Sequence, residues 1–299
     1  MTQELATRPI VDWEAVAGAF LREKEGRSGS TNTVSCYRHL LARFFGELGK
    51  EPPAVTTADV AGFILRPGPG GKPASGATSA WRLAVIGSFY AFCGRMDLTV
   101  SNPCAGVARP RAAPPIPQGL SVEEIRRLLA ACPDTCPGRR DRAIIEMLIY
   151  TGRRRAELLN LKVGDLSRNG GLYYSYRGKG GQLHRRELPP PAAAALLTWL
   201  ESCRRPLDEL GAAERVFDVS AQGFYMNLRR YYHKAGLPAA GVHVLRHSAA
   251  KLRVAAGETV EAVSRFLDHA SLATTTRYLR QLEGEADRGW ERVAALLRT

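Results

Sequence analysis

The stretch ARPRAAPPIPQG, residues 108–119, marks the clearest boundary in the chain. Its four prolines lack a backbone N–H and fix φ, so a helix cannot continue through it and an extended, semi-rigid connector is favoured. A chain of 299 residues that is 45% hydrophobic can bury a core on each side of such a connector. We therefore expect a first domain over 1–107, a linker over 108–119 and a second domain over 120–299.

Helical spacing of apolar residues fills the first part of the chain. Trp13, Val16 and Phe20 recur at helical intervals, and a second amphipathic run ends at Gly49. Thr57 is placed to cap a third helix, and a Gly- and Pro-rich loop separates it from a fourth. We expect an all-helical first domain with helices over 11–22, 31–48, 59–65 and 77–93.

The second part mixes helices with one hairpin. Ser121 and Glu124 have the spacing of a capping box, and the apolar run AIIEMLIY within 140–150 predicts a buried helix. The segments LYYSYR and LHRREL flank the turn GKGG and predict two antiparallel strands. The fold class is therefore mainly α with a small antiparallel β-sheet (α+β). Further helices are expected over 191–203, 220–235, 244–256, 259–267 and 285–297.

Positive charge is concentrated in the second part. The net charge is +13, and residues 111–299 hold 30 Lys and Arg against 20 Asp and Glu. A basic protein suits a polyanionic partner, although many arginine-rich proteins bind no nucleic acid. The N-terminus has no apolar signal segment and no run of 18 apolar residues occurs, so we expect a soluble, cytoplasmic protein without a membrane partner.

The cysteines do not have the spacing of a metal site. None of the six belongs to a CxxC pair, and no His or Cys pair follows Cys132 and Cys136 at a zinc-binding distance. We expect reduced, mostly buried thiols. We expect no metal and no cofactor, since no acidic cluster accompanies the residues that follow.

The first candidate site is TGRRRAEL, residues 151–158. Gly152 ends the buried helix and three arginines follow at once, so guanidinium groups lie beside a backbone turn, a geometry that suits phosphate. A charge run of this kind is more commonly a solvated face. Glu157 lies three residues after Arg154, on the same helical face, where an ion pair can orient the arginine.

The second candidate site is the run from HVLRH to LDHASLATTTRY. His243 and Arg246 lie three apart at a helix start, near the positive end of its dipole. His269 and Tyr278 follow. Arginine binds phosphate with a permanent charge, histidine exchanges a proton near neutrality and a tyrosine hydroxyl can become a covalent nucleophile. Taken singly, each residue is more commonly a packing or capping residue, and Lys179 in GKGG a merely exposed one.

The order of these motifs is specific. TG-x-R-x-x-E-L, a GKG hairpin, H-x-L-R-H, an L-x-H and a tyrosine nine residues later follow one another. Together they resemble the tyrosine recombinase (phage integrase) family, of the simple Xer-like or Cre-like two-domain type. The resemblance covers nearly the whole chain, since the first part is similar to the family's helical core-binding domain and 120–299 to its catalytic domain.

The resemblance implies a role for each matched residue. Arg154 and Arg246 would hold the scissile phosphate, and the hairpin residue Lys179 would protonate the leaving 5′-oxygen. His243 would handle a proton and His269 would bind the phosphate. Glu157 would support these residues, and Tyr278 would attack the phosphorus. We also expect four further cations to contact DNA, namely Arg153, Arg155, Arg82 and Lys72.

Three positions depart from the family pattern. Arg155 occupies a position that is usually apolar, and Ala156 one that is often serine. The common L-G-H is L-D-H here, so Asp268 places a carboxylate beside His269. That carboxylate either raises the pKa of the histidine or faces solvent. The departures leave the subfamily open.

The activity implied by the resemblance is site-specific DNA recombination through a 3′-phosphotyrosyl intermediate and a Holliday junction. Four copies would assemble on double-stranded DNA with paired inverted-repeat core sites, at the nucleoid, with the helix over 285–297 docking into a neighbouring protomer. A second recombinase or accessory protein is a possible partner, and chromosome resolution and mobile-element integration or transposition are not distinguished. The chain begins almost directly on the core-binding domain, which suggests no separate arm-binding domain.

Two other activities fit the same motifs. A type IB topoisomerase-like enzyme would use the same chemistry as a monomer to relax supercoils. A catalytically silent DNA-binding protein would keep the fold alone. The complete set of matched residues favours an enzyme over the silent protein.

Overall fold

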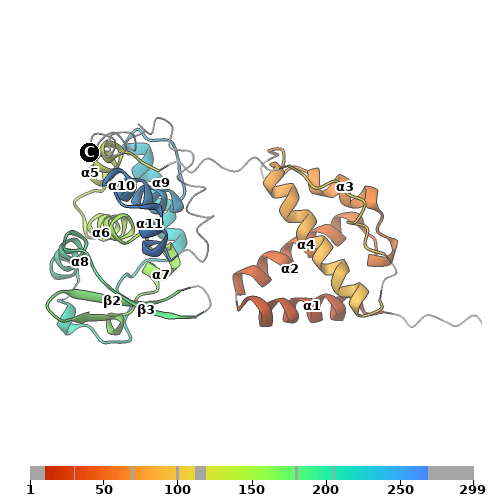
Figure 1. Cartoon of the computed structure of the whole chain (residues 1–299), viewed down its shortest axis with the longest axis horizontal. Helices are drawn as coiled ribbons and strands as arrows, with labels where there is room; N and C mark the ends of the chain where they lie inside the picture. Colours follow the sequence, from red (N-terminus) through yellow and green to blue (C-terminus); the bar gives the residue numbers. More distant parts are fainter. Residues whose placement is uncertain are drawn as a thin grey trace, which may run out of the picture. The chain divides into compact units, whose positions relative to one another are not determined.

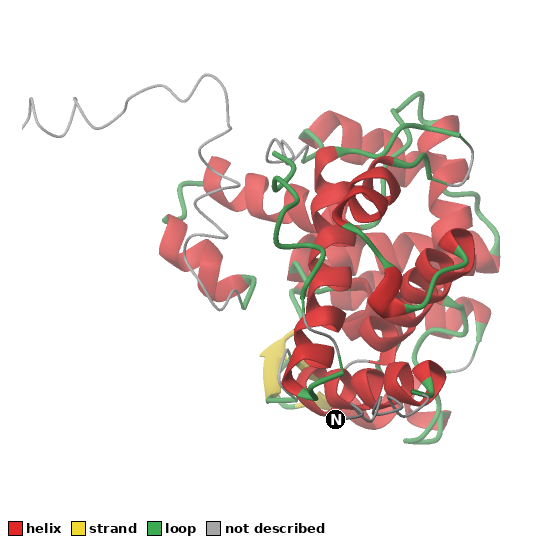
Figure 2. Cartoon of the chain, turned by 90° about the vertical axis from the view of Figure 1, so that its right-hand side faces the viewer, coloured by secondary structure: helices red, strands yellow, loops and turns green. Residues whose placement is uncertain are grey.

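The computed structural model contains mostly helices and one small sheet (Figure 2). The residues that it describes are 11–29, 31–68, 71–98, 101–111, 119–178, 181–204 and 206–268. The chain divides into two compact units, Met1–Pro115 and Ile116–Thr299, which are described one after the other. Most of the predicted linker, residues 112–118, and the predicted helix over 285–297 lie outside the described residues.

The described part of the first unit is helical (Figure 1). Its α1 begins after Asp12, whose carboxylate accepts hydrogen bonds from two backbone N–H groups of the first turn. The predicted third helix is capped by Thr56, not by Thr57, because Thr56 and Asp59 form the reciprocal bonds of a capping box. The elements are α1 (Trp13–Ser28), α2 (Thr31–Leu48), the 3₁₀ turn η1 (Pro52–Ala54), α3 (Thr57–Leu65) and α4 (Gly76–Arg95).

Phenylalanines form the core of the first unit. Phe44 and Phe63 meet edge to face with ring centroids 4.8 Å apart, and Phe20 meets Phe89 in the same way at 5.5 Å. All four side chains are buried. Edge-to-face aromatic pairs add about 0.5–1.5 kcal/mol to the burial of the rings themselves. The aromatic core therefore fixes how α1, α2, α3 and α4 pack.

The second unit is built around α6. This helix packs against α8 and α10 (Figure 1), and its side chains Ile144, Ile145 and Leu148 are buried in the core. The capping box predicted at Ser121 and Glu124 is present. The helices of this unit are α5 (Val122–Ala131), α6 (Cys136–Thr151), α7 (Arg155–Leu159), α8 (Pro190–Cys203), α9 (Ala221–Lys234), α10 (His243–Ala255) and α11 (Val260–Phe266), with 3₁₀ turns η2 (Val163–Asp165) and η3 (Leu207–Glu209).

The sheet has one strand more than predicted. It consists of β1 (Leu166–Arg168), β2 (Leu172–Arg177) and β3 (Leu183–Glu187), antiparallel in the order β1-β2-β3. On the central strand β2, Tyr174 and Tyr176 are buried while Tyr173 and Ser175 are partly exposed, the alternation expected of a half-buried strand. The predicted hairpin is therefore present, with Gly178 and Gln182 bonded to each other at its tip.

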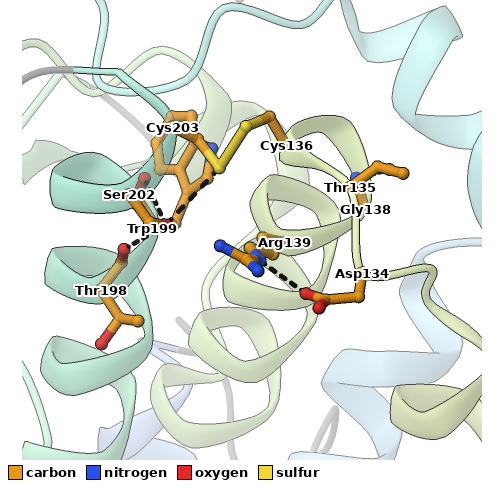
Figure 3. The surroundings of a disulfide bond; sticks show 9 residues. All are labelled: Asp134, Thr135, Cys136, Gly138, Arg139, Thr198, Trp199, Ser202 and Cys203. Carbon is orange, nitrogen blue, oxygen red and sulfur yellow. Dashed lines mark hydrogen bonds and ion pairs between the residues drawn. A yellow bond between two sulfur atoms is a disulfide. The ribbon is translucent and has the colours of Figure 1, made fainter.

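A disulfide bond corrects the prediction that the thiols are reduced. Cys136 at the start of α6 is bonded to Cys203 at the end of α8, and their Cα atoms are 5.2 Å apart (Figure 3). The prediction was wrong because 67 residues separate the two cysteines, and only the packing of α8 on α6 brings them together. The other four cysteines are free; they are Cys36, Cys93, Cys104 and Cys132.

None of the helices in the described part of the chain is long and apolar enough to cross a membrane.

Removing the disulfide should destabilise the second unit. We expect Cys203→Ser to lower its free energy of unfolding by about 2–4 kcal/mol, because a bond that closes so long a loop restricts the unfolded chain. Chemical denaturation with and without reductant measures the difference, with Cys36→Ser, an exposed free thiol, as the control. Equal stability of the oxidised and reduced wild type would contradict the bond.

Candidate active site

The candidate active site begins at the turn between α6 and α7. Gly152 ends α6 in the left-handed conformation, with φ of 62°. A Cβ at this position would lie 2.6 Å from Phe266 and 2.8 Å from Leu267. Glycine is therefore required both by the backbone conformation and by the close approach of the end of α11. The turn brings Arg153, the first of the three arginines, into contact with Phe266 and Asp268, which precede His269.

Arg154 is oriented by Glu157, as the spacing predicted. The Glu157 carboxylate accepts the backbone N–H of Arg154 at 2.9 Å and its guanidinium at 2.7 Å. The side chain of Glu157 is 8% exposed, whereas that of Arg154 is 34% exposed. The acidic partner is thus buried at the start of α7 and holds an arginine that solvent, and hence a ligand, can reach.

Arg246 joins the two turns of the site. It lies on the first turn of α10, is 7% exposed, and donates to the carbonyl oxygens of Gly152 and Leu267, each at 2.5 Å. Hydrogen bonds from a charged guanidinium to buried carbonyls are stronger than neutral ones and fix its plane. One buried side chain therefore links the end of α6, the start of α10 and the end of α11.

His243 is the first residue of α10, and its environment favours the neutral imidazole. Desolvation is the main cause that lowers the pKa of His243 below the ordinary 6.5, and the charges of nearby arginines add to it. These are Arg246, Arg155 and Arg154. A neutral imidazole at pH 7 can accept a proton. The three arginines also place positive charge near the His243 ring.

The remaining predicted residues have no described position. Lys179, His269 and Tyr278 lie outside the described residues. Two of them adjoin described residues in the sequence: Lys179 lies between β2 and β3, and His269 directly follows Asp268. The described structure thus brings together Arg154, Glu157, His243 and Arg246, and leaves the nucleophile to be proposed.

Two of the four arginines and lysines predicted to contact DNA are structural, so that prediction was wrong for them. Arg82 is 4% exposed and donates to the carbonyl oxygens of Ile64 and Arg66, which closes the end of α3. Arg153 is 2% exposed, and its guanidinium is bonded to Asp268 and to other groups inside the second unit. Both guanidinium groups are engaged within the fold, and we assign neither a contact with DNA.

The other two residues predicted to contact DNA are accessible to solvent. Lys72 is exposed, and Arg155 is partly exposed at the start of α7, where it donates to the carbonyl oxygen of Ala221 at 3.3 Å. Both stay predictions as DNA contacts.

Asp268 does not face solvent, which was one of the two alternatives considered from the sequence, and its effect on the pKa of His269 lies outside the described residues. Its carboxylate bonds to Arg153, Tyr176 and Arg186 and is mostly buried. Sequence reasoning assigned no role to Tyr176 or Arg186. A signal present in the sequence was charge, because Arg153 and the aspartate of L-D-H carry opposite charges.

Metal ligands do not gather in the described part of the chain. Among the residues with described positions, no three His, Cys, Asp or Glu side chains are grouped as they would be around an ion.

Comparison with known sequences gives one family. The profile of the phage integrase family matches residues 118–285, more than half of the chain. Tyrosine recombinase XerC of Roseiflexus castenholzii is 32% identical over 279 residues, which are 87% of each chain. XerC of Pelotomaculum thermopropionicum is 31% identical over 272 residues, 84% of this chain and 88% of that protein. Tyrosine recombinase XerD of Oceanobacillus iheyensis is 29% identical, covering 87% and 90%.

Comparison with solved structures confirms the fold class. A lambda integrase dimer bound to a COC′ core site has a TM-score of 0.70 at 16% identity, covering 92% of this chain and 98% of that one. XerH bound to a palindromic difH substrate has a TM-score of 0.67 at 20% identity, covering 92% and 83%. The mainly helical fold with its small antiparallel sheet is therefore shared with these proteins.

The histidines of α10 should make stability depend on pH. Burial, followed by the charges of His243 and Arg246, lowers the pKa of His247, and the pKa of His243 is lowered as well. Below pH 6.5 the unfolded chain therefore binds more protons than the folded one, so stability present above pH 6.5 is lost as pH falls through the folded pKa values. Thermal denaturation between pH 7.5 and 5 measures the loss.

The matched variants are His247→Gln and His233→Gln, the latter removing an exposed histidine of α9. We expect His247→Gln to lose less stability than the wild type over this pH range and His233→Gln to behave as the wild type. A His247→Gln variant with the full wild-type pH dependence would contradict the assignment.

Proposed function

The chain belongs to the phage integrase family and is a tyrosine recombinase, and on that premise we propose that it exchanges DNA strands through a covalent bond to Tyr278. The observation that most supports this is that Arg246 is bonded to the carbonyl oxygen of Gly152, two residues before Arg154, which Glu157 orients. A reachable arginine and a fixed buried one beside a backbone turn form a site suited to a phosphodiester.

The first step is a transfer of one phosphodiester bond. The Tyr278 hydroxyl attacks the phosphorus, a bond from phosphorus to the tyrosine oxygen forms, and the bond to the 5′-oxygen breaks. The phenolic proton passes to a base, for which His243 is suited because its lowered pKa keeps the ring neutral. Lys179 protonates the leaving 5′-oxygen. The products are a 3′-phosphotyrosyl bond and a free 5′-hydroxyl.

The arginines act on the charge that develops during attack. Arg154 and Arg246 would bind the non-bridging oxygens of the phosphate, and His269 would add a further hydrogen bond. Donors that are already fixed stabilise such charge without reorganising during the reaction, and one such donor contributes about 10²–10³-fold to the rate. The buried Glu157 keeps Arg154 in place, so its role is support and not proton transfer.

The second step reverses the first with a new strand. The 5′-hydroxyl of a partner duplex attacks the phosphotyrosyl bond, so the bond energy is conserved and neither ATP nor a metal ion is needed. Lambda integrase, which shares this fold, was solved both as a dimer on a core site and as a tetramer on a Holliday junction. By the same logic, four copies of this chain would act on paired inverted-repeat sites in double-stranded DNA.

The two units would divide this work. The first unit would be the core-binding domain, which grips the duplex, and the second the catalytic domain, with a helix over 285–297 that docks into a neighbouring copy. The protein would act at the nucleoid in the cytoplasm. Chromosome resolution and mobile-element integration both fit this activity.

A covalent protein–DNA complex tests the nucleophile. Purified protein is incubated, without divalent metal, with fragmented genomic DNA from the organism that encodes it, and adducts that survive SDS are recovered and sequenced. The recovered site, rebuilt as a nicked duplex, should then trap the wild type and give no adduct with Tyr278→Phe. An adduct that persists in Tyr278→Phe would reject the nucleophile, and tight binding without any adduct would show a silent DNA-binding protein.

The phosphate clamp gives a second prediction. Arg154→Ala should lower the rate of adduct formation by about 10²-fold or more, because a donor to the transition state is lost, while DNA affinity falls only a few-fold. Arg126→Ala, an exposed arginine of α5, is the control for the loss of one positive charge. Equal losses of cleavage and binding in Arg154→Ala would contradict the assigned role.

A further inference from the structure

Arg153 lies inside the second unit instead of facing DNA. Its Nη1 donates to the hydroxyl of Tyr176 and to the carboxylate of Asp268, and its Nη2 donates to the carbonyl oxygen of Phe266. Its Nε donates to the carbonyl oxygen of Thr151 at 3.1 Å. The guanidinium carbon also lies 4.7 Å from the centroid of the Tyr176 ring. All three nitrogen atoms of the guanidinium therefore donate hydrogen bonds within the fold.

Asp268 is the matching acceptor. One carboxylate oxygen accepts from both Arg153 and Tyr176, and the other accepts from Arg186 of β3 at 3.0 Å. The carboxyl side chain is 14% exposed. Burial alone would raise the pKa of Asp268, but the hydrogen bond from Tyr176 and the charge of Arg153 outweigh it and hold the pKa below its ordinary value. The Asp268 side chain is thus a charged carboxylate, and both of its oxygen atoms accept hydrogen bonds.

The backbone at Asp268 is as constrained as its side chain. Its φ is 49°, in the left-handed region that non-glycine residues rarely adopt and that aspartate tolerates better than most. The chain turns here as it leaves α11, and the next residue is His269. The side-chain bonds of Asp268 therefore fix the direction in which the chain enters the histidine.

The four residues connect the separate pieces of the proposed site. Arg153 is the neighbour of Arg154, and Asp268 is the neighbour of His269. Tyr176 on β2 and Arg186 on β3 lie on the two strands of the hairpin whose turn holds Lys179. No other group of described side chains in the second unit bonds the α6–α7 turn, the hairpin and the end of α11 to one another at one point.

We propose that Arg153, Tyr176, Arg186 and Asp268 form a positioning network that fixes the hairpin of Lys179 and the turn before His269 relative to Arg154. The proposal rests on the proposed function and adds residues that do not touch DNA. Their effect on the reaction is indirect: a displacement of about 1 Å in a reacting group can cost about 10²-fold in rate. Loss of the network should therefore slow cleavage and leave DNA binding intact.

Variants at Asp268 distinguish the effect of the carboxylate from that of the backbone conformation. Asp268→Gly keeps the left-handed conformation and removes the carboxylate, whereas Asp268→Asn keeps that conformation and one acceptor. On the nicked duplex, at saturating protein, we expect Asp268→Gly to form adduct 10- to 100-fold more slowly than the wild type and Asp268→Asn to be intermediate. DNA affinity should stay within about threefold. Wild-type cleavage by folded Asp268→Gly would overturn the proposal.

A double variant separates positioning from stability. Asp268→Gly alone leaves Arg153 buried without its carboxylate and should lower the melting temperature. Arg153→Met together with Asp268→Gly removes both charges, so stability should return toward that of the wild type while adduct formation stays slow. A purely structural network predicts the opposite: cleavage would recover together with the melting temperature, and that result would also overturn the proposal.

Controls distinguish the network from the proposed function itself. Asp134→Asn breaks an Asp–Arg pair at an exposed surface of the second unit and should cleave as the wild type. A wild-type protein that forms no adduct contradicts the proposed function, and the network proposal falls with it. A wild type that forms adduct, beside Asp268→Gly that cleaves at the same rate, contradicts only the network.

Discussion

The buried guanidinium of Arg246 is the interaction on which the rest of the second unit's site depends. Its two hydrogen bonds end on the carbonyl oxygens of Gly152 and Leu267, which belong to segments more than a hundred residues apart. Both carbonyls lie at helix ends, where no backbone partner within the helix remains for them. The arginine thereby supplies hydrogen bonds to two carbonyl oxygens that would otherwise be costly to bury, and it holds the two turns at a fixed separation.

Steric contact at Gly152 limits the same separation between the two turns. The end of α11 packs so closely on this residue that a single added carbon atom would meet Phe266 and Leu267. The close approach lets the side chain of Arg153 reach Asp268, and it leaves Arg154 at the surface with Glu157 beneath it. Packing on α6 therefore sets the positions of charged groups that are distant in sequence. The disulfide from Cys136 to Cys203 constrains the opposite end of the same helix.

Local signals account for what could be predicted from the sequence. Helix bounds followed from apolar spacing and from caps such as Ser121 with Glu124, because those interactions lie within one or two turns. The ion pair of Arg154 with Glu157 is equally local. The strand β1 has only three residues and exists through its pairing with β2, so no periodicity revealed it. The disulfide and the burial of Arg82 likewise arise from contacts between distant segments.

The three consecutive arginines show why residue type alone could not decide the site. Arg153 points into the core, where it is paired with Asp268. Arg154 forms an ion pair with Glu157 at the surface, and Arg155 lies on the first turn of α7. Successive side chains diverge because the left-handed turn at Gly152 precedes a new helix start, so neighbours in sequence face different surroundings. A basic run that appears uniform in sequence thus divides into a structural cation, an oriented cation and a surface cation. Only the oriented one, held by a buried acid and open to solvent, has the geometry of a phosphate ligand.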